Sequence, residues 1–155
     1  TQCTMVGNDA YWNRLAGIGL TDGARGAVLN NVSACNTVGI ADPEAVEAPP
    51  LNNIAYANVG PGIISQGDGN DHNIVSGNAG QPVACEEDAC GRAQYGGAGP
   101  GQHDLFAAPG FTDAVAGDFS LRDDSPAIDS GTEITDYYSS WEVEGTAIDR
   151  GSHER

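Results

Sequence analysis

Short apolar segments alternate with asparagine and glycine along the first half of the chain. Two asparagines separated by four residues occur four times, as Asn8/Asn13, Asn31/Asn36, Asn53/Asn58 and Asn73/Asn78. The first asparagines of successive pairs lie 23, 22 and 20 residues apart. A repeat of this length, built from short strands and turn residues, is typical of a solenoid in which each repeat forms one coil.

The repeat predicts a parallel β-helix of about four coils. Strands of successive coils stack about 4.8 Å apart, so equivalent asparagines meet and can form amide ladders. We therefore expect a structural ladder at the strand corners, formed by Asn13, Asn36, Asn58 and Asn78. The same spacing also fits a glycine-rich loop protein with accidental regularity, and it fits an antiparallel β-sandwich.

The residues that follow the first asparagines are expected to form the core, namely Val32, Ile54 and Ile74. Glycine (22 residues) and proline (8 residues) are frequent, and long helical apolar stripes are absent, which favours many short strands. We expect one domain, with coils and inserted loops over residues 1–103 and a final coil and capping segment over residues 104–155. Because no run of about 18 apolar residues occurs, we predict no membrane span. The chain begins at Thr1 without a signal segment, which suggests a processed protein or an excised fragment.

The charge balance is strongly acidic. Six arginines, no lysine and 22 acidic residues give a formal charge of −16. Nucleic acid is therefore not expected as a partner, because phosphate binding needs a basic surface. Such acidity fits divalent-cation binding, a salt-rich habitat or an extracellular protein kept soluble by repulsion, and it also fits a solvated surface without a specific partner.

The cysteines favour an oxidising compartment, so we expect a secreted or cell-surface protein. Cys85 and Cys90 can close a small disulfide loop. A bridge between Cys3 and Cys35 would complete the set, although spacing alone does not determine the pairing. The spacing does not match a zinc site, which more often has two-residue gaps.

The last third of the chain carries four motifs in a fixed order. They are Asp104-Leu-Phe-Ala-Ala-Pro-Gly-Phe-Thr-Asp113, Gly117-Asp-Phe-Ser-Leu-Arg122, Ser125-Pro-Ala-Ile-Asp-Ser-Gly131 and Ala147-Ile-Asp-Arg-Gly-Ser-His-Glu154. This series resembles the C-terminal end of secreted right-handed parallel β-helix proteins, in which "DPLFVDP…GDFRL…GSPAIDAG…DIGAYE" finishes the helix. It departs from that pattern at Arg150-Gly-Ser-His, where the family usually has Ile-Gly-Ala-Tyr. The family includes polysaccharide lyases, hydrolases and inactive surface proteins, so the resemblance implies a right-handed parallel β-helix that binds or acts on carbohydrate.

Open strand edges at the ends of a solenoid pair with other chains unless they are covered. We expect a cap seated on the last coil, formed by Phe106, Phe111, Phe119 and Leu121. The first end has no such cap. This asymmetry suggests a cut across a longer helix, or docking of the first coil on another chain, including end-to-end assembly.

The loop from Gln66 to His72 is the clearest candidate site. Asp68, Asn70 and Asp71 can offer carboxylate and amide oxygens to calcium, and His72 lies on the same turn. The loop does not match the EF-hand spacing, and the same residues suit an Asx turn that binds its own backbone. The loop therefore predicts either a calcium site or an Asx turn.

Further side chains suggest sugar binding or catalysis more weakly. Tyr11, Trp12 and Tyr56 can form an aromatic strip for sugar stacking if they point outward, and they can equally pack inside. His103 and His153 fit surface or capping histidines better than catalytic bases. Among 22 acidic residues no catalytic pair stands out.

Three functions remain from the sequence. The first is an extracellular module that binds polysaccharide or cell-surface glycan, or supports contact with it, and it is favoured because four coils form a stack of only about 20 Å. The second is a polysaccharide-degrading enzyme, a lyase or a glycoside hydrolase, that uses calcium and acidic residues. The third is a filament subunit that assembles end to end.

Overall fold

The computed structural model describes residues 3–20, 24, 26–43, 49–67, 69–83, 90–134, 143 and 145–154. In this part of the chain the regular elements are short β-strands, apart from helical turns at residues 90–94 that include η2 (Arg92–Gln94). The protein is thus nearly all-β, and its larger sheets are parallel. Over the same residues, no helix has the length and apolar character that a membrane crossing requires.

Three parallel sheets run through the successive repeats. The first sheet contains, in spatial order, β2 (Asp9–Tyr11), β5 (Val32–Ala34), β7 (Ile54–Tyr56) and β9 (Ile74–Ser76). The second contains β3 (Ala16–Gly19), β6 (Val38–Asp42), β8 (Ile63–Ser65) and β10 (Tyr95–Gly97). The third pairs β1 (Met5–Val6) with β4 (Val28–Leu29), and parallel bridges extend it from Leu29 to Leu51 and from Leu51 to Asp71.

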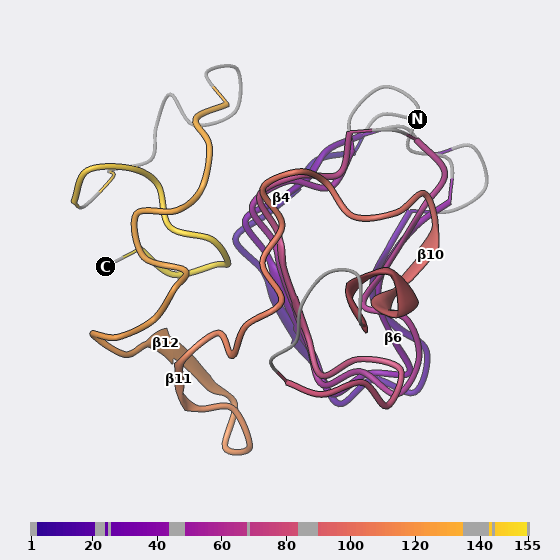
Figure 1. Ribbon diagram of the computed structural model, residues 1–155, viewed down its shortest axis with the longest axis horizontal. Helices are drawn as coiled ribbons and strands as arrows, with labels where there is room; N and C mark the ends of the chain where they lie inside the picture. The colour runs from indigo at the N-terminus through magenta and orange to yellow at the C-terminus, as the bar shows by residue number, and fades with distance from the viewer. Residues whose placement is uncertain are drawn as a thin grey trace.

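Equivalent residues of successive repeats lie directly opposite one another. In the first sheet Asp9 pairs with Val32, Val32 with Ile54, and Ile54 with Ile74. Figure 1 looks along the stack, and the described parts of the repeats between residues 3 and 80 nearly superimpose in that view. Each repeat therefore adds one strand to the first and second sheets, and a strand or a single bridge to the third.

Both asparagines of each pair form a ladder through the stack. At five of the six steps the backbone N–H and the side-chain amide of one asparagine both donate to Oδ1 of the next, at 2.8–3.2 Å. At the step from Asn36 to Asn58 the backbone N–H donates to Oδ1 at 2.8 Å, and the side-chain amide of Asn36 donates to the carbonyl oxygen of Ala10 and the hydroxyl of Ser33. One ladder is formed by Asn8, Asn31, Asn53 and Asn73. The second contains the predicted set, Asn13, Asn36, Asn58 and Asn78. The ladders bind backbone donors at corners where the strand pairing is interrupted.

The corners explain why the ladders are needed. The residue before each asparagine of the second ladder has a left-handed backbone, with φ of 56° at Trp12, 56° at Cys35, 53° at Ala57 and 66° at Gly77. This conformation costs roughly 1–2 kcal/mol for a residue with a side chain. The amide ladder supplies the local hydrogen bonds that hold these strained corners in place.

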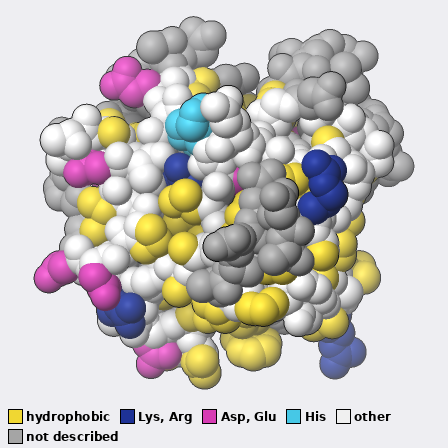
Figure 2. Space-filling model, in the orientation of Figure 1, with side chains coloured by type: hydrophobic (Ala, Val, Ile, Leu, Met, Phe, Trp, Pro, Cys, Tyr) yellow, Lys and Arg dark blue, Asp and Glu magenta, His cyan; other side chains and the backbone are white. Residues whose placement is uncertain are grey.

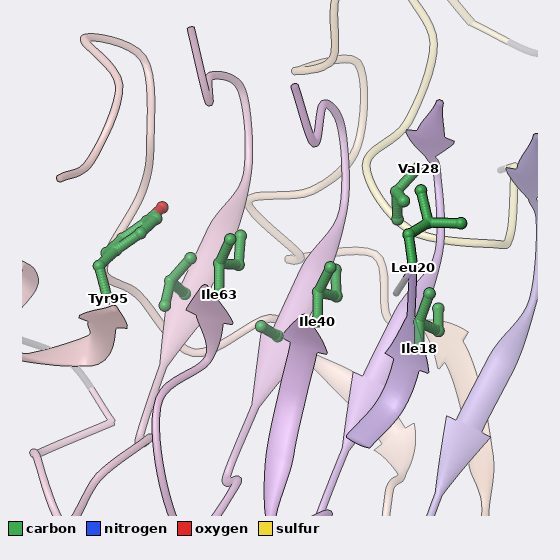
Figure 3. Close-up of a cluster of buried hydrophobic side chains, with 8 residues drawn as sticks. Ile18, Leu20, Val28, Ile40, Ile63 and Tyr95 are labelled. Atoms are coloured by element: carbon green, nitrogen blue, oxygen red, sulfur yellow. The ribbon is translucent and has the colours of Figure 1, made fainter. Parts of the chain in front are cut away.

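The interior of the stack is aliphatic. Ile18, Ile40 and Ile63 of the second sheet follow one another across neighbouring strands, and Tyr95 lies at the end of this row (Figure 3). From the first sheet, Ala55 and Val75 pack into the same cluster. These side chains are at most 9% exposed, so they form the central core.

The predicted core residues Val32, Ile54 and Ile74 are buried, but on the opposite face of the first sheet. Successive side chains of a strand point to opposite faces, so the neighbours that follow them, including Ala55 and Val75, occupy the interior. An outer face this apolar must itself be covered.

The C-terminal segment provides that cover. The antiparallel hairpin of β11 (Phe111–Asp113) and β12 (Asp118–Leu121) packs Phe111, Phe119 and Leu121 against Val32, Ile54 and Ile74. Figure 1 shows the hairpin and the residues after it beside the stack. The expectation that these three residues seat on the last coil is therefore wrong. Phe106 does pack against the central cluster, next to Gly91.

Cys3 and Cys35 are free thiols, so the expected bridge between them is also wrong. Cys3 lies beside Gly26, whereas Cys35 packs with the cluster on the outer face of the first sheet. Partial burial raises the pKa of the Cys35 thiol. Cys90 is buried, and Cys85 lies outside the described residues, so their pairing stays a prediction.

Candidate functional site

Both asparagine ladders end in a different residue type. Asp104 Oδ1 accepts hydrogen bonds from the backbone and side-chain nitrogens of Asn73 at 2.7 and 3.3 Å. Gln94 Oε1 accepts the equivalent pair from Asn78 at 2.9 and 3.1 Å. Leu105, directly after Asp104, forms a parallel bridge with Ile74. Residues 94–105 thus form the last rung at the end of the stack, in which Gln94 and Asp104 take the positions of the two asparagines.

Asp104 is a buried carboxylate in a network of donors. Its second oxygen accepts hydrogen bonds from the hydroxyl of Tyr95 and, at 2.8 Å, from the backbone of Gly101. Burial raises the pKa of Asp104, although these hydrogen bonds oppose the rise. Burial also raises the pKa of Tyr95 well above its ordinary value, and the charge of Asp104 adds to this effect. Tyr95 therefore stays a neutral donor.

Arg150, where the chain departs from the family series, reaches this network from the C-terminal segment. The residue is 4% exposed, and its guanidinium donates to the backbone oxygens of Asn73 at 2.9 Å and Ser130 at 3.0 Å. Burial lowers the pKa of Arg150, and the charges of Asp104 and Asp71 oppose that change. The buried cation thus compensates the buried carboxylate and ties the segment to the stack.

Asp104→Asn should lower the free energy of unfolding by about 2 kcal/mol. The substituted amide would point its own N–H groups at the donors of Tyr95 and Gly101, which now bind a carboxylate oxygen. Urea denaturation measures the change. Asp113→Asn, at the exposed end of β11, is the matched control and should shift stability by less than about 0.5 kcal/mol. Equal effects of the two variants would contradict the role given to Asp104.

Asp71, His72 and His103 meet at the edge of the last rung. Asp71 occupies the third-sheet position held by Leu29 and Leu51 in earlier repeats. His72 occupies the left-handed corner held there by Asn30 and Asn52, with φ of 54°. A carboxylate and an imidazole thus replace structural residues at one end of the stack.

The three side chains are in direct contact. His103 Nδ1 lies 2.8 Å from Asp71 Oδ2, and the backbone N–H groups of His103 and His72 donate to Asp71 Oδ1 at 2.6 and 3.0 Å. His72 Nε2 lies 3.8 Å from Asp71 Oδ2. The two imidazole rings stack with centroids 4.6 Å apart and planes inclined by 20°.

Asp71 is held as an anion by these contacts. Partial burial raises its pKa, but the hydrogen bonds from the side chain and backbone of His103 and the backbone of His72, together with the charge of His72, lower it below the ordinary value overall. A lowered folded-state pKa contributes stability above the unfolded value, and that stability is lost as the pH falls through the folded pKa.

The titration of Asp71 gives a direct check of this arrangement. By carboxyl-detected NMR, the pKa of Asp71 should lie below the ordinary value of an aspartate in the wild-type chain, and His103→Ala should move it upward. His153→Ala, which removes a histidine from a different carboxylate, should leave it in place. An unchanged pKa in His103→Ala would show that this contact is absent in solution.

A hollow of about 500 Å³ opens beside Asp71. Its polar lining comes from Asn70, Asp71, Arg92 and Gln102, and the segment from Ala98 to Gly101 closes one side. Asn70 is 2% exposed, its amide nitrogen lies 3.5 Å from the carbonyl oxygen of Gly99, and its Oδ1 has no hydrogen-bond partner among the described residues. In Figure 2 a histidine side chain lies in the upper half of the view, arginine side chains lie in both halves, and acidic side chains lie mainly toward the left.

No family model, curated protein or solved structure significantly matches this chain. The geometry of its own residues is therefore the basis for assigning a function.

The predicted calcium residues are partly brought together. Asn70 and Asp71 line the hollow, whereas Asp68 lies outside the described residues. His103 and Arg92 were not singled out for this site from the sequence. The available signal was His103-Asp104-Leu105, which repeats the pattern of His72-Asn73-Ile74 after 31 residues.

The predicted aromatic strip lies elsewhere. Tyr11 packs edge-on against Phe119, with ring centroids 5.2 Å apart, and Tyr56 packs edge-on against Phe111, with ring centroids 5.8 Å apart. Both tyrosines therefore support the C-terminal hairpin, and Trp12, which follows Tyr11 in the chain, is 62% exposed.

The remaining histidine has a structural role. His153 Nε2 lies 3.0 Å from Asp9 Oδ2, and the hydroxyl of Ser152 donates to the second oxygen of Asp9. Serine and histidine both bind the carboxylate, so this is not the arrangement of a catalytic triad, in which the histidine lies between the two. The contacts fasten the C-terminal segment to β2.

Proposed function

We propose that this chain is an extracellular right-handed parallel β-helix module that binds polysaccharide or cell-surface glycan in the hollow beside Asp71. Three in-register parallel sheets with a repeat of 20 to 23 residues support the β-helix. Right-handed crossing between parallel strands is the general preference, and the C-terminal motifs resemble those of secreted right-handed β-helices.

The composition of the hollow is the observation that carries glycan binding. Amide, carboxylate and guanidinium groups of Asn70, Asp71, Arg92 and Gln102 surround one concave space. Its volume of about 500 Å³ falls in the range of roughly 300–1,000 Å³ that small-ligand sites occupy. Such a set pairs with both the donors and the acceptors of sugar hydroxyl groups.

The negative charge of the chain favours neutral glycans over acidic ones. A formal charge of −16 repels acidic polymers, although exposed charges are screened beyond about 8 Å at physiological salt. Arg92 is a local exception to this acidity. We therefore favour a neutral, hydroxyl-rich polysaccharide, with Arg92 donating to hydroxyl or ring oxygens.

Arg92→Ala should weaken glycan binding by about tenfold, the loss expected for one or two good hydrogen bonds. Affinity gel electrophoresis against a panel of neutral and acidic polysaccharides measures the change. Arg14→Ala, an exposed arginine on the first repeat, is the matched control and should bind as the wild type does. Loss of binding in Trp12→Ala alone would move the site to the aromatic surface.

A second candidate function is polysaccharide cleavage. The observation that favours it is the contact of His103 with Asp71 beside the hollow, because a carboxylate that orients an imidazole is a common device for general base catalysis. Release of reducing ends, or ultraviolet absorbance of an unsaturated product, tests it on the same panel. Absence of turnover on every polysaccharide, with calcium added, would eliminate the enzyme.

A third candidate is end-to-end assembly. Strands β1, β2 and β3 are the edge strands of their sheets at the same end of the stack, and Asn8 and Asn13 form the outer rung of each ladder. Strand edges of this kind accept a further strand. Light scattering at high concentration should then detect oligomers, and a monomer throughout would exclude the filament.

A further inference from the structure

We propose that Asp71, His72 and His103 bind a transition-metal ion, with zinc as the first ion to test. This site shares Asp71 with the hollow of the proposed glycan site, but metal binding is measured with no sugar present and goes beyond that function. It also differs from the calcium site expected from the sequence, which involves oxygen ligands only.

The positions of the donor atoms support a metal. One carboxylate oxygen of Asp71 and one ring nitrogen from each histidine lie within 4.8 Å of one another. Asp71 Oδ2 lies 2.8 Å from His103 Nδ1 and 3.8 Å from His72 Nε2. Bonds of about 2.0–2.2 Å in a tetrahedron place zinc ligands about 3.3 Å apart, between these two distances. Small rotations of the exposed His103 ring would complete the geometry.

The surroundings of His72 orient it as a ligand. Its Nδ1 lies 3.4 Å from the backbone oxygen of Ser130, and its Nε2 faces Asp71. Donation from Nδ1–H to Ser130 leaves the Nε2 lone pair directed at the cluster. Metal-binding histidines in proteins use the same arrangement, in which the second ring nitrogen donates to a carbonyl or carboxylate.

Asn70 provides an independent observation at the same place. Its side chain is buried, its Oδ1 accepts no hydrogen bond from the part of the chain that the structure describes, and it lines the hollow next to Asp71. A buried amide oxygen without a donor is rare and costs free energy. Water bound to a metal ion on the neighbouring Asp71 would supply that missing donor.

The donor set selects the class of ion. Two imidazole nitrogens and one carboxylate suit zinc and similar transition metals, whereas calcium takes six to eight oxygens. The two imidazole rings stack with centroids 4.6 Å apart, which places both beside the same carboxylate of Asp71. The positive charge of Arg150 would repel a bound metal ion. The carboxylates of Asp104 and Asp71 interact with that charge and compensate it.

Isothermal titration of the full chain with zinc chloride alone, after removal of metals with a chelator, tests the proposal. We expect one site, and His103→Gln should weaken it by about tenfold or more, as should Asp71→Asn. His153→Gln, which removes a histidine bound to the distant carboxylate of Asp9, is the matched control and should bind zinc unchanged. Calcium in large excess should not displace zinc.

Cobalt substitution and folding controls make the result decisive. Cobalt bound at this site should give the visible absorbance of a nitrogen- and oxygen-ligated ion, and His103→Gln should abolish it. Circular dichroism and the urea midpoint establish that each variant is folded, and His103→Gln changes a half-exposed side chain. Zinc binding that is absent in the wild type, or that survives both His103→Gln and Asp71→Asn, would overturn the site. Glycan binding measured on the metal-free chain tests the glycan proposal separately.

Discussion

Asn58→Ala should lower the free energy of unfolding by about 3 kcal/mol. Asn58 is 2% exposed, and its Oδ1 accepts the backbone N–H of Asn36 at 2.8 Å. Its amide nitrogen donates to Asn78 Oδ1 at 2.8 Å and to the carbonyl oxygen of Ser33 at 3.0 Å. Alanine would leave a buried donor and a buried acceptor unpaired, each at a cost of about 1–3 kcal/mol. Urea denaturation followed by circular dichroism measures the loss.

Asn13→Ala is the matched control. Asn13 donates to Asn36 through the same pair of nitrogens, at 2.8 and 3.1 Å, but it is exposed at the outer rung. Water can replace its hydrogen bonds, so we expect a loss below about 1 kcal/mol. Equal losses at Asn58 and Asn13 would mean that the ladder does not hold the stack together.

Phe119→Ala should lower the free energy of unfolding by about 3–5 kcal/mol, the usual cost of removing a buried phenylalanine. Phe119 is 1% exposed and packs edge-on against Tyr11 at 5.2 Å and Phe111 at 5.1 Å. It belongs to the cluster that covers Val32 and Ile54 on the outer face of the first sheet. Its removal would loosen the C-terminal segment from that face.

Val115→Ala tests whether this effect is specific to the interface. Val115 lies in the turn of the same hairpin and is 81% exposed, so its loss should change stability by less than about 0.5 kcal/mol. Amide hydrogen exchange should also rise in β5 and β7 of Phe119→Ala. If Phe119→Ala is as stable as Val115→Ala, the segment does not cover the sheet in solution.

The sequence predicted the repeat because identical side chains meet in a ladder. Each asparagine must lie opposite the next asparagine, so the register of the stack is visible as the spacing of one residue type. Strained corners add to this signal, since few residues tolerate a positive φ and asparagine or glycine often appears near them.

Which side chains of the first sheet point into the interior of the stack could not be predicted in the same way. Val32, Ile54 and Ile74 alternate with Ser33, Ala55 and Val75, so both faces of the later strands are apolar. Only the position of the C-terminal hairpin shows that the larger aliphatic residues point outward beneath it. Because side chains alternate along a strand, either set could face the interior. The C-terminal hairpin, which is distant in sequence, covers one of the two faces and so decides between them.

The candidate site was partly visible. Asn70, Asp71 and His72 are close in sequence, and their chemistry suggested a cation. His103 and Arg92 follow an excursion that breaks the 20-residue spacing, so their approach to Asp71 and the hollow depends on how the last rung folds back. Asp104 in the ladder position of asparagine is the feature that brings His103 onto His72.

The binding of a glycan in the hollow is tested most directly by NMR. The ¹⁵N-labelled chain should be titrated with an oligosaccharide from the polysaccharide that binds best on the panel. We predict that amide resonances of Asn70, Gly99 and Gly101 shift with saturation, and that those of Tyr11 and Trp12 do not. Shifts confined to Tyr11 and Trp12, or the absence of shifts around the hollow, would contradict the proposed site.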